Sequence, residues 1–324
     1  MLKKLAALPA PALALLFLLA LLRSPQAALE GARQGLAVCG ARIIPALLPF
    51  LVLSGLVGAL GLADGLAGAL SRPLARLFAA PGCVAAPFLL GLCGGYPVGA
   101  ASLAGLVRDG TLTAEEAGRM LPVCNNTGPA FLLGAVGLGV FGSGAAGALL
   151  YAAHALAALI LGLLGSIGKS RRVQEPLTAP PAPRPLSTAL PESVRGAVTA
   201  ALNISGFVVF FSVLTALAEA AGLLPQTAGA LSARFGLELH AARALLTGLL
   251  ELGGGVAAMD GLAPTPGNLA LAAFLLGFGS LSVHCQTLAA LEGTDIKTSR
   301  HFAGRLIHGV LSAGMVFFAA QFFF

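Results

Sequence analysis

The sequence predicts an all-α polytopic membrane protein with two inverted-topology repeats, each containing a re-entrant hairpin and an interrupted transmembrane helix. Three observations predict this class: the composition, the length of the apolar runs, and motifs that recur in the second half. Of the 324 residues, 57% are hydrophobic and only 10% are charged, and the mean hydropathy is +0.91. Soluble domains carry about 25% charged residues. The composition therefore excludes a soluble enzyme.

The apolar runs of the chain are long enough to form membrane-spanning helices. Runs of 18 or more residues are dominated by Leu, Ala, Gly and Phe. A helix needs about 20 apolar residues to cross ~30 Å of hydrocarbon, whereas a membrane barrel shows ~10-residue stretches of alternating polarity. The net charge is +6, but the basic residues lie in short loops between the apolar runs, so no basic soluble domain remains. We therefore expect helices in a lipid bilayer and no nucleic-acid partner.

The chain divides into four segments. Residues 1–24 begin with Lys3 and Lys4 and continue apolar, which is typical of an N-terminal transmembrane helix or of a signal-like segment. Residues 25–168 form the first membrane repeat and residues 196–324 the second. Residues 169–195, between them, are rich in basic residues and proline, which predicts an extended cytoplasmic linker.

Each repeat contains two long spans with two interrupted apolar stretches between them. In the first repeat a span follows an interfacial stretch, and Thr113 and Glu116 form a capping box that starts a short polar helix. The expected features of the first repeat are the interfacial stretch 25–42, the spans 43–63 and 145–167, and the interrupted stretches 84–106 and 121–140. Those of the second are the spans 197–224 and 303–322, with interruptions at 253–255 and 280–287.

The two halves share motifs at a nearly constant spacing. Residues 89–95, which end in Cys93-Gly94-Gly95, match residues 249–255 at an offset of 160. Residues 123–127 match residues 283–287 at the same offset, and the preceding spans align at 161. A Leu- and Gly-rich chain can give one such match by chance, but three in nearly one register indicate a duplicated unit.

The distribution of positive charge predicts that the two units are inverted. With the N-terminus inside and with 84–106 and 245–262 as hairpins that do not cross, the chain crosses the bilayer seven times and ends outside. The cytoplasmic side then holds Lys3, Lys4, Arg72, Arg76, Arg108, Arg119, Lys169, Arg171, Arg172, Arg184, Arg195, Lys297, Arg300 and Arg305. The outer side holds Arg23, Arg33, Arg42, Arg234 and Arg243. This excess of fourteen inside over five fits the positive-inside rule.

The interruptions collect most of the polar residues expected at membrane depth. Unwound backbone there leaves N–H and C=O groups free to bind a polar solute, as in transporters with broken helices. The predicted solute-binding residues are Gly94, Gly95, Tyr96, Asn125, Asn126, Thr127, Ser280, Ser282, His284 and Gln286. The alternative is that the amides cap broken helix ends and that Ser and His link helices.

Glu251 is the acidic residue that we expect inside the membrane. A long apolar flank precedes it and three glycines follow, after Leu252, and a carboxylate at such depth commonly marks an ion or proton pathway. We predict Glu251 and, more weakly, Asn203 as ion-coupling residues, with Na⁺ or H⁺ as the coupled ion. The alternative for Glu251 is a place near the mouth of the second hairpin.

Neither a metal nor a catalytic site is predicted. The five cysteines are widely spaced without a CxxC pair, and the five histidines lack zinc-ligand spacing. The sequence contains neither a nucleophile elbow nor a P-loop. We therefore expect no cofactor, no metal and no enzyme activity, and homo-oligomerisation is left open.

Three motifs resemble a known family. Residues 45–50 (Pro-Ala-Leu-Leu-Pro-Phe), 94–100 (Gly-Gly-Tyr-Pro-Val-Gly-Ala) and 124–130 (Cys-Asn-Asn-Thr-Gly-Pro-Ala) occur in the order and spacing of the YlbJ family of sporulation integral membrane proteins. The resemblance covers roughly residues 30–324. It implies a nucleoside-recognition (Gate) domain in each repeat and a bacterial plasma-membrane protein of spore formation, in particular of the spore cortex.

The Gate domain is similar to part of the concentrative nucleoside transporters, whose cores contain two oppositely facing hairpins. This similarity implies a secondary transporter or permease for a small polar solute, nucleoside-like or other, that works by alternating access. The sequence departs from the expected pattern after Glu251, where glycines follow instead of a polar pair. The alternative hypothesis is a membrane scaffold or ligand sensor of the sporulation machinery that transports nothing.

Overall fold

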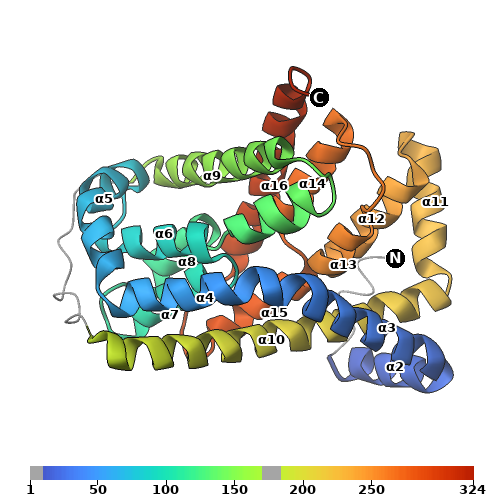
Figure 1. Cartoon of the computed structure of the whole chain (residues 1–324), viewed down its shortest axis with the longest axis horizontal. Helices are drawn as coiled ribbons and strands as arrows, with labels where there is room; N and C mark the ends of the chain where they lie inside the picture. The colour runs from blue at the N-terminus through green and yellow to red at the C-terminus, as the bar shows by residue number, and fades with distance from the viewer. Residues whose placement is uncertain (1–9, 170–183) are drawn as a thin grey trace.

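The computed structural model describes residues 10–169 and 184–324, and within these residues the fold is all-helical (Figure 1). The predicted class of a polytopic all-α membrane protein is thereby confirmed. The first half contains α2 (Ala10–Arg23), α3 (Pro25–Val38), η1 (Cys39–Ile43), α4 (Ile44–Ala59), α5 (Leu62–Phe78), η2 (Gly82–Val84), α6 (Ala85–Gly94), α7 (Val98–Arg108), α8 (Ala114–Cys124), η3 (Ala130–Leu138) and α9 (Gly144–Ser166). The second half contains α10 (Leu186–Ala220), α11 (Leu223–Phe235), α12 (Leu239–Leu250), α13 (Leu252–Ala257), α14 (Pro266–Phe278), α15 (Leu281–Ala290) and α16 (Ser299–Ala320).

Five helical stretches among the described residues are long and apolar enough to cross a membrane. They are Pro25–Ala59, Gly144–Ser166, Leu186–Ala220, Pro266–Ala290 and Ser299–Ala320. A sixth is possible if Ala67–Phe78 and Gly82–Gly94, which bend by 109°, count as one span. The predicted count of seven is not confirmed, because α8 and η3 are not among these stretches and residues 1–9 of the predicted first helix lie outside the described residues.

The two longest helical stretches lie antiparallel, side by side (Figure 1). Gly31 packs against Ala216, Gly35 against Ser212, and the backbone N–H of Arg184 donates to the carbonyl of Ala59. Residue numbers therefore rise along one helix as they fall along the other. Gly31 and Gly35 allow this close approach, since a Cβ at either position would lie 3.0 Å or less from atoms of α10.

The order of elements is the same in both halves. Apart from α2 and η2, which have no counterparts in the second half, each half begins with a 35-residue helical stretch, Pro25–Ala59 or Leu186–Ala220. A left-handed glycine follows each stretch (Gly61 at φ 71° and Gly222 at φ 73°) and starts α5 or α11. A pair of short helices, a broken helix and a long final helix come next in both. Figure 1 places α5 and α11 near opposite ends of the antiparallel pair.

Two segment boundaries differ from the sequence predictions. The predicted interfacial stretch 25–42 is helical and continuous with the first span. In the predicted linker, residues 170–183 lie outside the described residues, but α10 begins at Leu186. Its first turns are helical despite Pro191 because Ala189, Ser193 and Ala197 are buried, and packing outweighs local propensity.

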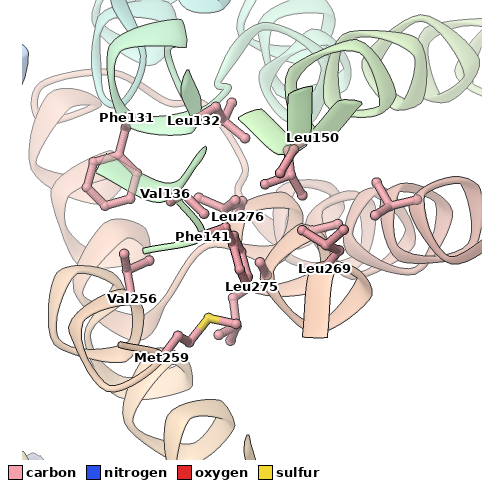
Figure 2. Close-up of a cluster of buried hydrophobic side chains, with 14 of the residues drawn as sticks. Phe131, Leu132, Val136, Phe141, Leu150, Val256, Met259, Leu269, Leu275 and Leu276 are labelled. Atoms are coloured by element: carbon pink, nitrogen blue, oxygen red, sulfur yellow. The ribbon is translucent and has the colours of Figure 1, made fainter. Parts of the chain in front are cut away.

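The largest apolar cluster joins the two halves (Figure 2). Leu132 and Val136 of η3 and Leu150 of α9 pack with Leu275 of α14 and Val256 of α13. All five side chains are at most 1% exposed. Lipid-facing positions carry exposed apolar side chains instead, as expected for helices in hydrocarbon. The cluster contains residues at or near all four helix breaks described below, namely Tyr96, Phe131, Leu252 and Val283.

Candidate functional site

The first hairpin turns at Gly95. This residue ends α6 in a left-handed conformation (φ 79°), and α7 begins at Val98. The hairpin packs directly on the end of α8, since a Cβ at Gly91 would lie 1.6 Å from the Cys124 carbonyl oxygen and one at Gly99 would lie 1.9 Å from it. Only glycine permits this approach of the two backbones.

The second break separates α8 from η3 over residues 125–129. Pro129 lacks an N–H donor, and Asn125 already has extended backbone (φ −94°, ψ 90°). The break is polar and fully enclosed, because Asn125 and Asn126 are 0% exposed and Thr127 is 2% exposed. The predicted interruption at Asn125–Pro129 is therefore present in the structure.

The third and fourth breaks lie in the second half, and a polar side chain caps the helix that follows each. Glu251 has extended backbone between α12 and α13, and its carboxylate accepts the N–H of Gly253 at 2.9 Å and that of Gly254. Gly279 ends α14 in the left-handed region (φ 81°). Ser280 then caps α15 by accepting the N–H of Val283 at 3.1 Å.

A cavity of about 470 Å³ lies where all four breaks meet. Its polar lining comprises Tyr96 from the first break, Thr127 from the second, Glu251 from the third, and Gln286 from α15, the helix that follows the fourth. Apolar side chains of the antiparallel pair, including Ile43 and Ile204, complete the wall. Residues far apart in the sequence thus converge on one cavity.

Five of the twelve predicted site residues line this cavity: Gly95, Tyr96, Thr127, Glu251 and Gln286. The others are buried around it, except Asn203. Those beside the lining are Gly94, Asn125, Asn126, Ser280, Ser282 and His284. Asn203 is exposed on α10, whereas Ile204 and Val208 of the same helix line the cavity. The structure therefore does not bring Asn203 to the site, because it lies on the opposite face of the helix.

Hydrogen bonds connect the breaks of the two halves. The Leu276 carbonyl, near the end of α14, accepts the hydroxyls of Thr127 at 2.9 Å and of Tyr96 at 3.2 Å. The Asn125 amide donates to the Thr287 hydroxyl at 2.9 Å. The Gln286 amide, by contrast, donates to Ser282 within α15, at 3.2 Å. Part of the predicted polar set thus holds the broken helices together, which is the alternative that the sequence left open.

Arg305 is the central residue that the sequence analysis missed. It was assigned to the cytoplasmic loops, but it is 0% exposed inside α16. Its guanidinium donates to the Tyr96 hydroxyl, to Asn126 Oδ1 at 3.4 Å and to His308 Nδ1 at 3.0 Å. A signal was present in the sequence, because His301, Arg305, His308 and Ser312 recur at the spacing of one helix face.

Two buried histidines lie beside this network. His154 Nε2 accepts the backbone N–H of Thr127 at 3.1 Å, which satisfies one donor freed by the second break. The rings of His154 and His308 are 4.3 Å apart. Among the described residues, no three His, Cys, Asp or Glu side chains converge on a point that a metal ion could occupy.

Two larger hollows flank the central cavity. One, of about 1710 Å³, lies between α3, the C-terminal half of α10, α12 and α13; we call it the α12 hollow. The other, of about 1230 Å³, lies between α4, the N-terminal half of α10, α6 and α7; we call it the α7 hollow. Glu251 lines both the central cavity and the α12 hollow, whereas the α7 hollow shares no lining residue with the cavity.

The spans and the buried polar breaks define a multi-pass α-helical membrane protein with a cavity between its two halves. The chain is 30% identical, over 318 residues, to the sporulation integral membrane protein YlbJ of Bacillus subtilis (strain 168). The match covers 90% of this chain and 77% of that protein. The chain therefore belongs to the family of YlbJ. No protein-family model matches it, and no solved structure matches it.

Proposed function

We propose that this protein acts in the membrane during bacterial spore formation, in particular of the cortex, as a secondary transporter or permease for a small polar solute. The name of YlbJ describes that relative as a sporulation integral membrane protein, which supports the sporulation part of the proposal. The transport part rests on the site. The solute would bind in the central cavity and reach either side of the bilayer by alternating access.

The observation that carries the transport proposal is the convergence of four helix breaks on one cavity. Non-helical backbone at membrane depth is tolerated only where protein or a watery space surrounds it. Broken helices of this kind form the midplane sites of secondary transporters. A scaffold protein has no need of four breaks around one cavity lined by polar side chains.

The polar lining of the cavity suits an uncharged or weakly charged polar solute. Tyr96 and Thr127 supply hydroxyl groups, and the Gln286 amide can both donate and accept. Such groups recognise amides, carboxylates and nucleobase edges equally well, and a nucleoside is one member of this range. Asn125 and Asn126 support the lining from behind, since their hydrogen bonds run to protein groups.

An inverted relation between the two halves supports alternating access. The corresponding stretches Pro25–Ala59 and Leu186–Ala220 are antiparallel in the structure. Ser212, Thr215 and Ala216 line the α12 hollow, while Leu51, Ser54 and Gly55, which precede them by 161 residues, line the α7 hollow. The two hollows therefore use corresponding positions at opposite ends of the pair, and each would serve as the entrance from one side.

The proposed location is the bacterial plasma membrane with a cytoplasmic N-terminus. Because Arg305 is buried in α16, the predicted cytoplasmic charge falls by one, and the excess over the outer side remains large enough to set the orientation. Glu251 is the proposed H⁺ or Na⁺ coupling residue, since its carboxylate lies at the boundary between the central cavity and the α12 hollow.

A thermal-shift screen of the detergent-purified protein tests the proposed site. The panel contains nucleosides, nucleobases, amino acids, dicarboxylates and dipicolinate, and Gln286→Ala is measured in parallel. A ligand of the folded state stabilises it by about 2.7 kcal/mol at a hundred times Kd. Gln321→Ala, which removes the same side chain from the exposed end of α16, is the matched control.

We expect one chemical class to raise the melting temperature of the wild type and of Gln321→Ala, with a much smaller rise for Gln286→Ala. That class is then tested for uptake into proteoliposomes. Binding without uptake would overturn the transport proposal in favour of a ligand sensor. If no compound raises the melting temperature and none is taken up, the protein would be a scaffold, and the search would turn to a protein partner.

A further inference from the structure

Arg305 contacts three of the four breaks at once. Besides Tyr96 and Asn126, its guanidinium donates to the carbonyl oxygens of Pro122 and Leu276, each at 3.4 Å. Tyr96 belongs to the first break, Pro122 and Asn126 to the second, and Leu276 to the helix that ends at the fourth. The residue therefore joins elements of both halves from a single position on α16.

These contacts explain how a buried cation is tolerated. Pro122 and Leu276 lie in the last turns of α8 and α14, where carbonyl groups have no intrahelical donor. The C-terminal end of a helix also carries partial negative charge. Two such ends face Arg305, and no carboxylate pairs with it among the described residues. The planar guanidinium, with five donors, can satisfy both ends and two side chains together.

The third break is held differently. The Glu251 carboxylate binds the N–H groups of Gly253 and Gly254, which belong to its own turn. Leu252 and Val256 connect this hairpin to the protein through the apolar cluster of Figure 2, which contains Phe131 and Leu275. Two ion pairs also join this hairpin and its end to the antiparallel pair, Arg243–Glu219 and Arg42–Asp260, but their side chains are 33–48% exposed and such pairs contribute little. Apolar contacts are non-directional, so they restrain sliding less than the buried hydrogen bonds of the other three breaks do.

The packing of the two hairpins shows the same contrast. The first hairpin lies against the Cys124 carbonyl through Gly91 and Gly99. In the second hairpin the close backbone contact is internal, because a Cβ at Gly255 would lie 2.1 Å from the Cα of Gly248 in the other arm. The second hairpin is thus a tightly closed unit in itself, and it borders the α12 hollow through Glu251 and Gly254.

We propose that Arg305 is a positioning residue that ties the first, second and fourth breaks into one rigid unit, and that the second hairpin, α12 to α13, moves against this unit. Its movement at Glu251 would join the central cavity to the α12 hollow and so open the site to one side of the membrane. This inference rests on the proposed transport function for the purpose of the movement, but the division into a tied unit and a separate hairpin is independent of any solute.

Hydrogen–deuterium exchange on the full-length protein in nanodiscs, without solute, tests this division. In the wild type, amides of residues 251–256 should exchange at least tenfold faster than those at 95–99, 125–128 and 279–281, because local opening needs less free energy where fewer bonds break. In Arg305→Gln, we expect exchange at the three tied breaks to rise together by about tenfold or more, with little change at 251–256.

Two further variants make the test specific. Arg305→Lys keeps the charge but lacks the planar fork, so the three breaks should show an intermediate rise. Arg300→Gln removes an exposed arginine from the first turn of the same helix and should change none of them. If Arg305→Gln does not fold, the exchange pattern of the wild type and that of Arg305→Lys still test the proposal.

A rise confined to α16, or an equal rise at 251–256, would overturn the positioning role. Wild-type exchange at 251–256 as slow as at the other breaks would overturn the moving hairpin. If the expected exchange pattern is observed but no solute is taken up, the division into a tied unit and a separate hairpin stands, and only the transport function is refuted.

Discussion

The close packing of the first hairpin on α8 gives the sharpest stability prediction. We consider Gly91→Ala. The added Cβ would lie 1.6 Å from the Cys124 carbonyl oxygen, and Cβ atoms essentially never approach other atoms closer than 3.0 Å. The hairpin must therefore move away from α8 by more than 1 Å, because the carbonyl is backbone and cannot rotate aside.

The expected cost follows from this displacement. Overpacking a buried site typically costs 1–3 kcal/mol, and the movement also strains the bond from Tyr96 to the Leu276 carbonyl. We expect a loss of about 3 kcal/mol, which corresponds to a fall in melting temperature of roughly 4 °C for a chain of this size. The protein contains no Trp, so a thiol-reactive dye that reports exposure of buried cysteines is a suitable probe.

Gly105→Ala is the matched control, since nothing lies within 4 Å of a Cβ at this position of α7. The same change there should stabilise the helix by roughly 0.5–1 kcal/mol. If Gly91→Ala melted at the same temperature as Gly105→Ala, the close contact between the hairpin and α8 would be refuted, and the geometry of the first two breaks with it.

Three further predictions concern single polar contacts, each followed by thermal melting. Thr113→Ala removes the capping box of α8, in which Thr113 accepts the N–H of Glu116 at 3.2 Å, and should cost about 1 kcal/mol; no change would mean that this helix start is frayed. Thr127→Val leaves the Leu276 carbonyl without its shortest hydrogen bond and should cost about 1–3 kcal/mol, whereas an unchanged melting temperature would argue against the link between the halves. Arg42→Ala breaks a salt bridge to Asp260 whose side chains are 33% and 48% exposed, so a loss above about 1 kcal/mol would contradict the exposure of the pair.

The class of fold and the first two breaks could be predicted from the sequence because they depend on local chemistry. The predicted interruptions at 253–255 and 280–287 were wrong in position, since residues 252–257 and 281–290 are helical and the breaks lie at Glu251 and at Gly279. Gly95 and Gly279 adopt positive φ, and Pro129 lacks a donor, so each disturbs a helix wherever it lies. Glu251 also stood out, since a carboxylate in an apolar run is costly to bury. Its role as the cap of α13 needed the structure, because the carboxylate bonds depend on how the chain turns at the break.

The remaining features depend on tertiary contacts. Arg305 looked like a loop charge because it lies close to Lys297 and Arg300 in the sequence, and only the ends of α8 and α14 explain its burial. The start of α10 at Leu186 was hidden by the surrounding prolines, although burial of Ala189 and Ser193 stabilises it. Asn203 was misplaced because an apolar membrane helix has no polar face to show which side points inward.

The most direct test of the central claim, that the cavity between the four breaks is the solute site of a transporter, is uptake of a labelled solute into proteoliposomes. The solute is the one that raises the melting temperature of the wild type. The proposal predicts time-dependent uptake by the wild type and by Gln321→Ala, and at least tenfold slower uptake by Gln286→Ala at low solute concentration. Equal uptake by all three proteins would place the site elsewhere, and binding without uptake by any of them would contradict transport.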